Sequence, residues 1–298
     1  MLSALTLAAL AALGWGSSEF LAGLWSRRLS VLVVLGWSKV TGLLLAGVLV
    51  VAHGTALPRD GRLWWAVLAG LCSTPALGLL YLAMRKGSLA VVAPVAAVAA
   101  LVPLVWGAIR GERLSVDDAV GIVAVLAGVT LVSWPTGTTR AGASKNGVAM
   151  LYAMGAALGF GAFLVLVHHS SAVDPVWSIA LARTSSGVLG IGMLIAAVAR
   201  DLHRDPFWTG AGVRARRQPV SVAAVVGVVA IGLTDTAGDA AFAFASTIGE
   251  LSSVAVLSSL YPAVTVLFGA WILGERLTGP RAWGVLAALA GGAFLAAS

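Results

Sequence analysis

Long apolar runs, separated by short polar connections, fill this chain of 298 residues and restrict what it can fold into. An α-helix needs about 20 mostly apolar residues to cross the hydrocarbon core of a bilayer. The sequence predicts ten such helices, at 3–25, 31–52, 64–84, 88–109, 116–135, 147–168, 175–199, 220–245, 250–272 and 280–297. The longest connection, near 200–219, is too short to fold as a domain of its own.

The composition supports lipid as the solvent for most of the chain. Hydrophobic residues make up 59% of it and charged residues 10%, whereas about 25% of a typical soluble domain is charged. The net charge of +7 does not indicate nucleic acid, because the basic residues are scattered through the connections, where charge sets membrane orientation. Cys72 is the single cysteine and lies in an apolar run, which excludes a disulfide framework and a cysteine metal site. We therefore predict an all-α, multi-pass protein of the cell (inner or plasma) membrane, in contact with membrane lipid and without cofactor or metal.

The second half of the chain repeats features of the first. Residues 111–134 and 274–297 are identical at ten of 24 aligned positions, at an offset of 163. We therefore divide the chain into two five-helix repeats, 1–138 and 145–298. Because five is odd, the second copy must enter the membrane in the opposite orientation. Such inverted repeats are typical of secondary transporters that work by alternating access.

Short motifs add to the repeat. Gly-Glu-Arg-Leu follows both the fourth and the ninth predicted helix, residues 15–20 read Trp-Gly-Ser-Ser-Glu-Phe, and residues 260–262 read Leu-Tyr-Pro. With ten helices in two copies, these motifs resemble the drug/metabolite transporter superfamily, EamA type, over nearly the whole chain. The resemblance implies a carrier of small metabolites without naming one substrate. The fourth helix departs from the family, because Pro94 and Pro103 flank the position at which its proline is expected.

Five ionisable residues lie deep in predicted spans: Glu19, Lys39, Arg183, Asp235 and Asp239. Each costs at least ~2.5–3.5 kcal/mol at the centre of a membrane helix, so all five should face the bundle interior or a wet cavity. Asp235 and Asp239 are four residues apart and share a helix face. Two carboxylates so close in a low dielectric tend to hold one proton between them, which predicts a proton-coupling pair or a binding site for an amine. The alternative is structural ion pairing, of Glu19 with Lys39 and of Arg183 with either aspartate.

Aromatic side chains complete the predicted site. Trp15, Trp37, Tyr81, Tyr152 and Tyr261 all lie within predicted spans. Aromatic faces beside a few polar groups suit small amphiphilic ligands, so we expect these residues to line the same cavity. The alternative for each of them is packing or anchoring at the membrane interface.

Other residues predict local structure. Glu112 and Glu275, in the repeated Gly-Glu-Arg-Leu motif, are expected to form local surface pairs or to cap a loop. Pro262 is the best candidate for breaking a helix that lines a cavity. Gly121 and Gly128 are seven residues apart on one helix face, which predicts close helix packing within one protomer or between two.

The sequence thus predicts a secondary active transporter, an exporter of a small amphiphilic metabolite such as an amino acid or an organic cation. We expect alternating access, with protons as the candidate coupling ion, in a monomer or a homodimer that does not bind nucleic acid. The first alternative is a flippase for lipid or lipid-linked substrates. An intramembrane enzyme or a channel is less favoured, since the spans contain no HExxH motif, phosphate loop or Ser–His–Asp arrangement. Lysine and arginine gather in odd-numbered connections, which places both termini outside, whereas the family resemblance implies both in the cytoplasm.

Overall fold

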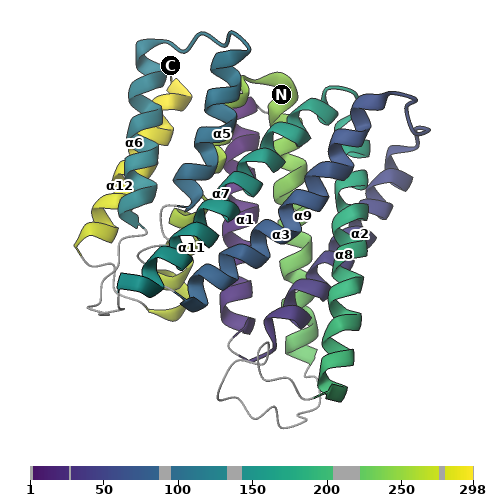
Figure 1. Ribbon diagram of the computed structural model, residues 1–298. Coiled ribbons are helices and arrows are strands. Elements are labelled where there is room, and N and C mark those ends of the chain that lie inside the picture. The colour runs from purple at the N-terminus through teal and green to yellow at the C-terminus, as the bar shows by residue number, and fades with distance from the viewer. Residues whose placement is uncertain are drawn as a thin grey trace.

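The computed structural model describes residues 3–26, 28–86, 95–132, 143–203, 222–274 and 279–297, and the regular structure within them is helical (Figure 1). The first half contains α1 (Ala4–Ser26), α2 (Val31–His53), the short 3-10 helix η1 (Gly61–Leu63), α3 (Trp64–Lys86), α5 (Val95–Ile109) and α6 (Val116–Val132). The second half contains α7 (Ala143–Ser171), α8 (Pro175–His203), α9 (Val222–Ile248), α10 (Leu251–Ser258), α11 (Tyr261–Leu273) and α12 (Pro280–Ala297). Both chain ends lie at the same end of the bundle (Figure 1).

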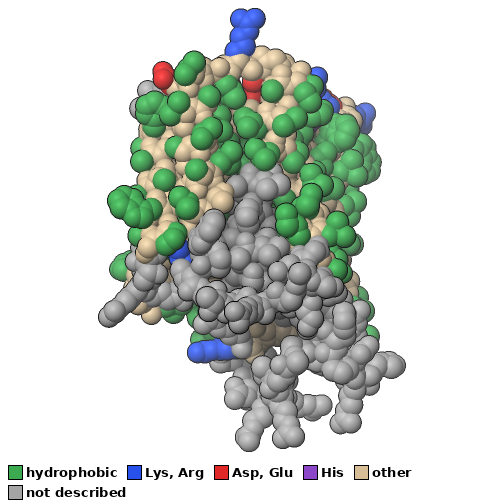
Figure 2. All heavy atoms as spheres, turned by 60° about the vertical axis from the view of Figure 1, so that its left-hand side comes forward, with side chains coloured by type: hydrophobic (Ala, Val, Ile, Leu, Met, Phe, Trp, Pro, Cys, Tyr) green, Lys and Arg blue, Asp and Glu red, His purple; other side chains and the backbone are tan. Residues whose placement is uncertain are grey.

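The helices carry the apolar surface of a membrane protein. Among the described residues, seven helical segments are long and apolar enough to cross a membrane. Shorter apolar helices cover 99–109 and 280–295. Hydrophobic side chains spread over the face seen in Figure 2, and the charged side chains in that view lie towards its two ends. The all-helical membrane fold is therefore confirmed; the start of the predicted fourth span, 88–94, lies outside the described residues.

Helices of one half pack mainly against helices of the other. The main contacts join α1 to α9, α3 to α7, α2 to α8 and α6 to α12. Figure 1 shows α6 with α12 on one side of the molecule and α2 with α8 on the other. α1 and α3 of the first half correspond to α7 and α9 of the second, so exchanging the halves turns the contact of α1 with α9 into that of α7 with α3. The other two pairs each join corresponding helices, so the exchange leaves them the same. The core is thus shared between the halves.

Glycines bring α6 and α12 together in antiparallel orientation. A Cβ atom at Gly128 would lie 2.3 Å from the backbone nitrogen of Ala288, and one at Gly291 would lie 2.8 Å from that of Val125. Real side chains do not fit at such distances, so glycine allows the two backbones to touch. Gly128 and Gly291 occupy equivalent positions in the two repeats, 163 residues apart, and so do Val125 and Ala288. Each half therefore makes the same glycine contact with the other. The predicted close packing is confirmed, within one protomer.

The ninth predicted span is broken into α10 and α11. α10 ends at Ser258, and Pro262 follows in the first turn of α11. A proline ring clashes with the carbonyl group four residues earlier, which here belongs to Ser258. The backbone N–H that proline lacks is not needed in the first turn of a helix. The break predicted at Pro262 is confirmed, and it places Ser259 in the lining of a central cavity.

Candidate functional site

A cavity of about 130 Å³ lies between the two halves. Residues of α1, α2, α3 and α5 line it from the first half, and residues of α7, α9, α10 and α11 line it from the second. The larger apolar side chains in its wall are Leu35, Leu77, Phe160, Phe163, Leu164 and Ile231. Pockets for drug-sized ligands usually measure about 300–1,000 Å³, so in this conformation the cavity fits only a small solute.

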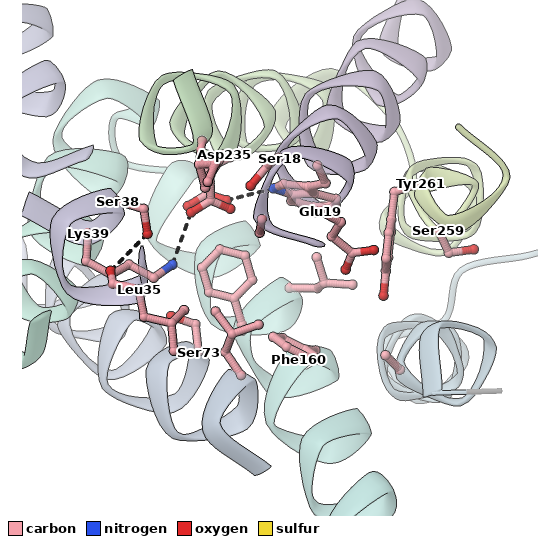
Figure 3. Close-up of a pocket in the computed structure, with 18 of the residues that line it drawn as sticks. Ser18, Glu19, Leu35, Ser38, Lys39, Ser73, Phe160, Asp235, Ser259 and Tyr261 are labelled. Carbon is pink, nitrogen blue, oxygen red and sulfur yellow. Dashed lines mark hydrogen bonds and ion pairs between the residues drawn. The ribbon is translucent and has the colours of Figure 1, made fainter. Parts of the chain in front are cut away.

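Four of the five predicted ionisable residues lie together, and we call Lys39, Arg183, Asp235 and Asp239 the ion cluster. Lys39 and the two aspartates line one wall of the cavity, whereas Arg183 is buried and is not part of the lining. Arg183 of α8 lies between the two aspartates of α9, with its Nη1 2.7 Å from Asp235 Oδ2 and its Nη2 2.6 Å from Asp239 Oδ2. Nζ of Lys39, on α2, is 3.0 Å from the same Oδ2 of Asp235 (Figure 3). With all four groups ionised, the ion cluster has no net charge.

The ion cluster shows how the predicted residues pair. Asp235 and Asp239 share a helix face as expected, and both lie within ion-pair distance of Arg183. Their role as a proton-coupling pair stays a prediction. The pair expected between Glu19 and Lys39 is wrong, because Lys39 binds Asp235. The alternative pairing of Arg183 with the aspartates is confirmed. The shared helix face of the two aspartates was predicted correctly, and their basic partner, Arg183, comes from another helix.

Trp15 connects α1 to the ion cluster. Its indole Nε1–H donates to Asp239 Oδ1 at 2.9 Å. The ring also packs against Phe242 and Tyr261, with centroid separations of 5.8 and 6.3 Å. A Cβ atom at Gly238 would lie 2.6 Å from Cδ1 of this indole, so only glycine leaves room for Trp15 beside the aspartate.

Glu19 lies one helical turn from Trp15 and faces the same cavity. Figure 3 shows its carboxyl group near the ring of Tyr261, on the other side of the cavity from Lys39 and Asp235. Within the part of the chain that the structure describes, Glu19 forms neither an ion pair nor a hydrogen bond through its side chain. It is therefore the acid of this cavity that no described basic residue balances.

Three of the predicted aromatic residues are not part of the described lining. Trp37 stands two positions before Lys39, about 200° around the same helix, and is 53% exposed. Because Lys39 faces the cavity, Trp37 points away from it, which corrects the prediction. Tyr152 of α7 packs beside a small apolar cluster that contains Leu80, and it is not among the residues that line the cavity. The side chain of Tyr81, on α3, lies outside the described part of the chain.

Sequence reasoning missed several small polar residues of the lining: Ser18, Ser73 and Ser259. Serine in a membrane helix can bond to the carbonyl group of the preceding turn, so its presence alone indicates no site. The repeat held a signal for one of them. At an offset of 162, Ser73 and Leu77 occupy the positions of Asp235 and Asp239, and both line the cavity.

Comparison with known proteins agrees with the fold. The model of the EamA-like transporter family matches residues 2–134 and 147–297. A solved structure, described only as the crystal structure of a protein, is 18% identical, covers 99% of this chain and 99% of its own, and has a TM-score of 0.75. At that identity the likeness concerns the fold alone. No curated protein sequence matches this chain. From the family match over both halves, this chain belongs to the EamA-like transporter family.

Proposed function

We propose that this protein is a secondary active transporter that exports a small organic cation across the cell membrane, by alternating access and in exchange for protons. The observation that carries the proposal is an apolar cavity between the halves, with a balanced ion cluster on one wall and the unbalanced Glu19 on another. Ionisable groups inside a membrane are costly, and they usually mark the path of a substrate or an ion.

Two inverted repeats would supply the motion. The corresponding helices α6 and α12 run antiparallel, and so do α2 and α8, where Gly36 approaches Leu194 and Leu43 approaches Gly187. Corresponding helices lie antiparallel when the two halves enter the membrane from opposite sides. An exchange of conformation between such halves opens a central cavity first to one side and then to the other.

The charges favour a cation over a zwitterion. The ion cluster is neutral, so both of its basic residues are already engaged by carboxylates. A zwitterionic amino acid needs a free basic group for its carboxylate, and the described lining offers none. Glu19 supplies one negative charge to a cavity that Trp15 also lines, and its carboxyl group lies near the ring of Tyr261 (Figure 3). A monovalent organic cation with an apolar body matches this carboxylate and these aromatic faces.

A proton and the cation would then compete for one carboxylate. Glu19 balances a single positive charge, which is either a bound cation or its own proton. Each cycle therefore exchanges one cation for one proton and moves no net charge. We expect a pH gradient to drive the exchange and the membrane potential to leave it unchanged.

Reconstituted vesicles test this. The purified protein in proteoliposomes is offered organic monocations, amino acids, sugars and nucleosides, while a trapped pH dye reports protons and valinomycin with potassium sets the potential. We expect saturable proton flux with monocations, unaffected by the potential, and its loss in Glu19→Gln. Asp117→Asn, which makes a similar charge change on the exposed start of α6, is the matched control and should transport normally. Coupled transport in Glu19→Gln, net current, or transport of no solute contradicts the proposal.

A further inference from the structure

The glutamate of the first Gly-Glu-Arg-Leu motif reaches into the other half of the protein. Glu112 lies in the turn between α5 and α6. Its Oε1 accepts the backbone N–H of Leu251 at 2.9 Å, and its Oε2 accepts that of Ser252 at 3.2 Å. The hydroxyl group of Ser252 donates to the same Oε2. The sequence predicted a local surface pair or a loop cap; the structure has a cap, and the capped helix, α10, belongs to the second half.

The surroundings of Glu112 are shaped for this contact. The first N–H groups of a helix have no acceptor within the helix, and the positive end of the helix dipole favours a carboxylate there. Glu250, the residue that precedes α10, makes no capping hydrogen bond with its side chain. A Cβ atom at Gly107 would lie 2.0 Å from Glu112 Oε2, so glycine clears the space for the carboxylate. Gly111 turns the chain towards it with a positive φ of 90°.

The capped helix closes one end of the cavity. This is the end at which α1 begins, because a Cβ atom at Gly249 would lie 2.4 Å from Cβ of Ala4. Leu251 and Val254 of α10 are completely buried there, at 1% and 0% exposure. One turn further, Ala255 already lines the cavity. The first turn of α10 therefore fills the space between the cavity and the end of the bundle that carries both chain termini.

We infer that Glu112 is a latch: a positioning residue that holds α10 against the first half and keeps this end of the cavity closed. The inference rests on the alternating access of the proposed function. Because Glu112 and α10 belong to different halves, their hydrogen bonds must break before the first turn of α10 can move aside. The latch therefore sets how often this end opens, without touching the solute.

Cysteine labelling tests the latch without any substrate. In a Cys72→Ser background, Val254→Cys is exposed to a membrane-impermeant maleimide in proteoliposomes, with and without Glu112→Ala. Hydrogen bonds to a charged group favour the closed state by about tenfold or more, so we expect Glu112→Ala to raise the labelling rate by about that factor. Glu112→Gln keeps one acceptor oxygen and should give an intermediate rate.

A second position separates latch release from general loosening. Val129 is completely buried in α6, which packs on α12. It stands thirteen residues after Val116, where α6 begins, which is about 20 Å along the helix from the turn that holds Glu112. Val129→Cys should stay protected in Glu112→Ala. Unchanged labelling of Val254→Cys, or an equal rise at Val129→Cys, would overturn the latch. Since labelling needs no solute, the transport assay can fail while this one succeeds, and the reverse.

Discussion

Replacing Asp235 by Asn removes the charge at the centre of the ion cluster and keeps the size of the side chain. Oδ2 of Asp235 lies 3.0 Å from Nζ of Lys39 and 2.7 Å from Nη1 of Arg183. After the change, two buried cations face the single carboxylate of Asp239. The variant therefore leaves one positive charge in the interior without a counter-charge.

The cost follows from burial. Removal of one partner of a buried ion pair typically destabilises a protein by about 3–5 kcal/mol. Arg183 is 2% exposed, but the side chain of Asp235 is 22% exposed towards the cavity, so solvent screening places the cost near the lower limit. For chains somewhat shorter than this one, each 1 kcal/mol lowers the melting temperature by about 2–4 °C, so we expect a decrease of about 6–12 °C.

Thermal stability in detergent measures this effect. Samples are heated in steps, and the fraction that stays monodisperse on size-exclusion chromatography gives an apparent melting temperature. The variant Asp235→Asn with Lys39→Met removes one charge of each sign and leaves the pair of Arg183 with Asp239. We expect it to recover at least half of the lost stability, since coupled residues do not give additive effects. An unchanged melting temperature in Asp235→Asn, or purely additive losses in the double variant, would refute the reasoning.

Three further changes use the same melting assay. Gly128→Leu forces a side chain into the backbone of α12, and overpacking of this kind should destabilise the protein by about 1–3 kcal/mol. Gly47→Leu, at an exposed position where an added Cβ has no neighbour within 4 Å, is the control. Trp15→Phe keeps the ring contacts but removes the donor to Asp239, with an expected loss of about 1.5–3 kcal/mol. Asp174 accepts two backbone N–H groups at the start of α8, so Asp174→Ala should cost about 1 kcal/mol, while Asp174→Asn keeps the cap and most of the stability.

The helices could be located from the sequence because membrane solvent selects for long apolar runs. The predicted span 3–25 and the observed α1 (Ala4–Ser26) differ by one residue at each end. The differences are larger where a helix leaves the apolar zone. α7 begins at Ala143 and α8 ends at His203, in each case four residues beyond the predicted span. Those extensions are polar, and hydropathy does not distinguish a polar helix from a polar loop.

The ionisable residues of the site could also be found, because their cost in lipid makes them conspicuous. Their partners could not, because pairing depends on how distant helices pack. Lys39 and Asp235 are 196 positions apart, and no local pattern in the sequence connects them. The interpretation of two neighbouring aspartates as a proton pair used only their own helix. Arg183 of α8 lies between them in space, and no pattern on their own helix predicts that neighbour.

The ion cluster joins helices that belong to different sequence repeats. Lys39 belongs to the first half and Asp235 to the second, and the Trp15 indole adds α1 to the same network. Separating buried, balanced charges is costly, so we expect α1, α2, α8 and α9 to move as one body although they come from both halves. Glu112 instead joins the halves by accepting two backbone N–H groups of α10, so its release separates no pair of opposite charges. We therefore expect the ion cluster to hold together during the cycle, while the contact of Glu112 with α10 breaks.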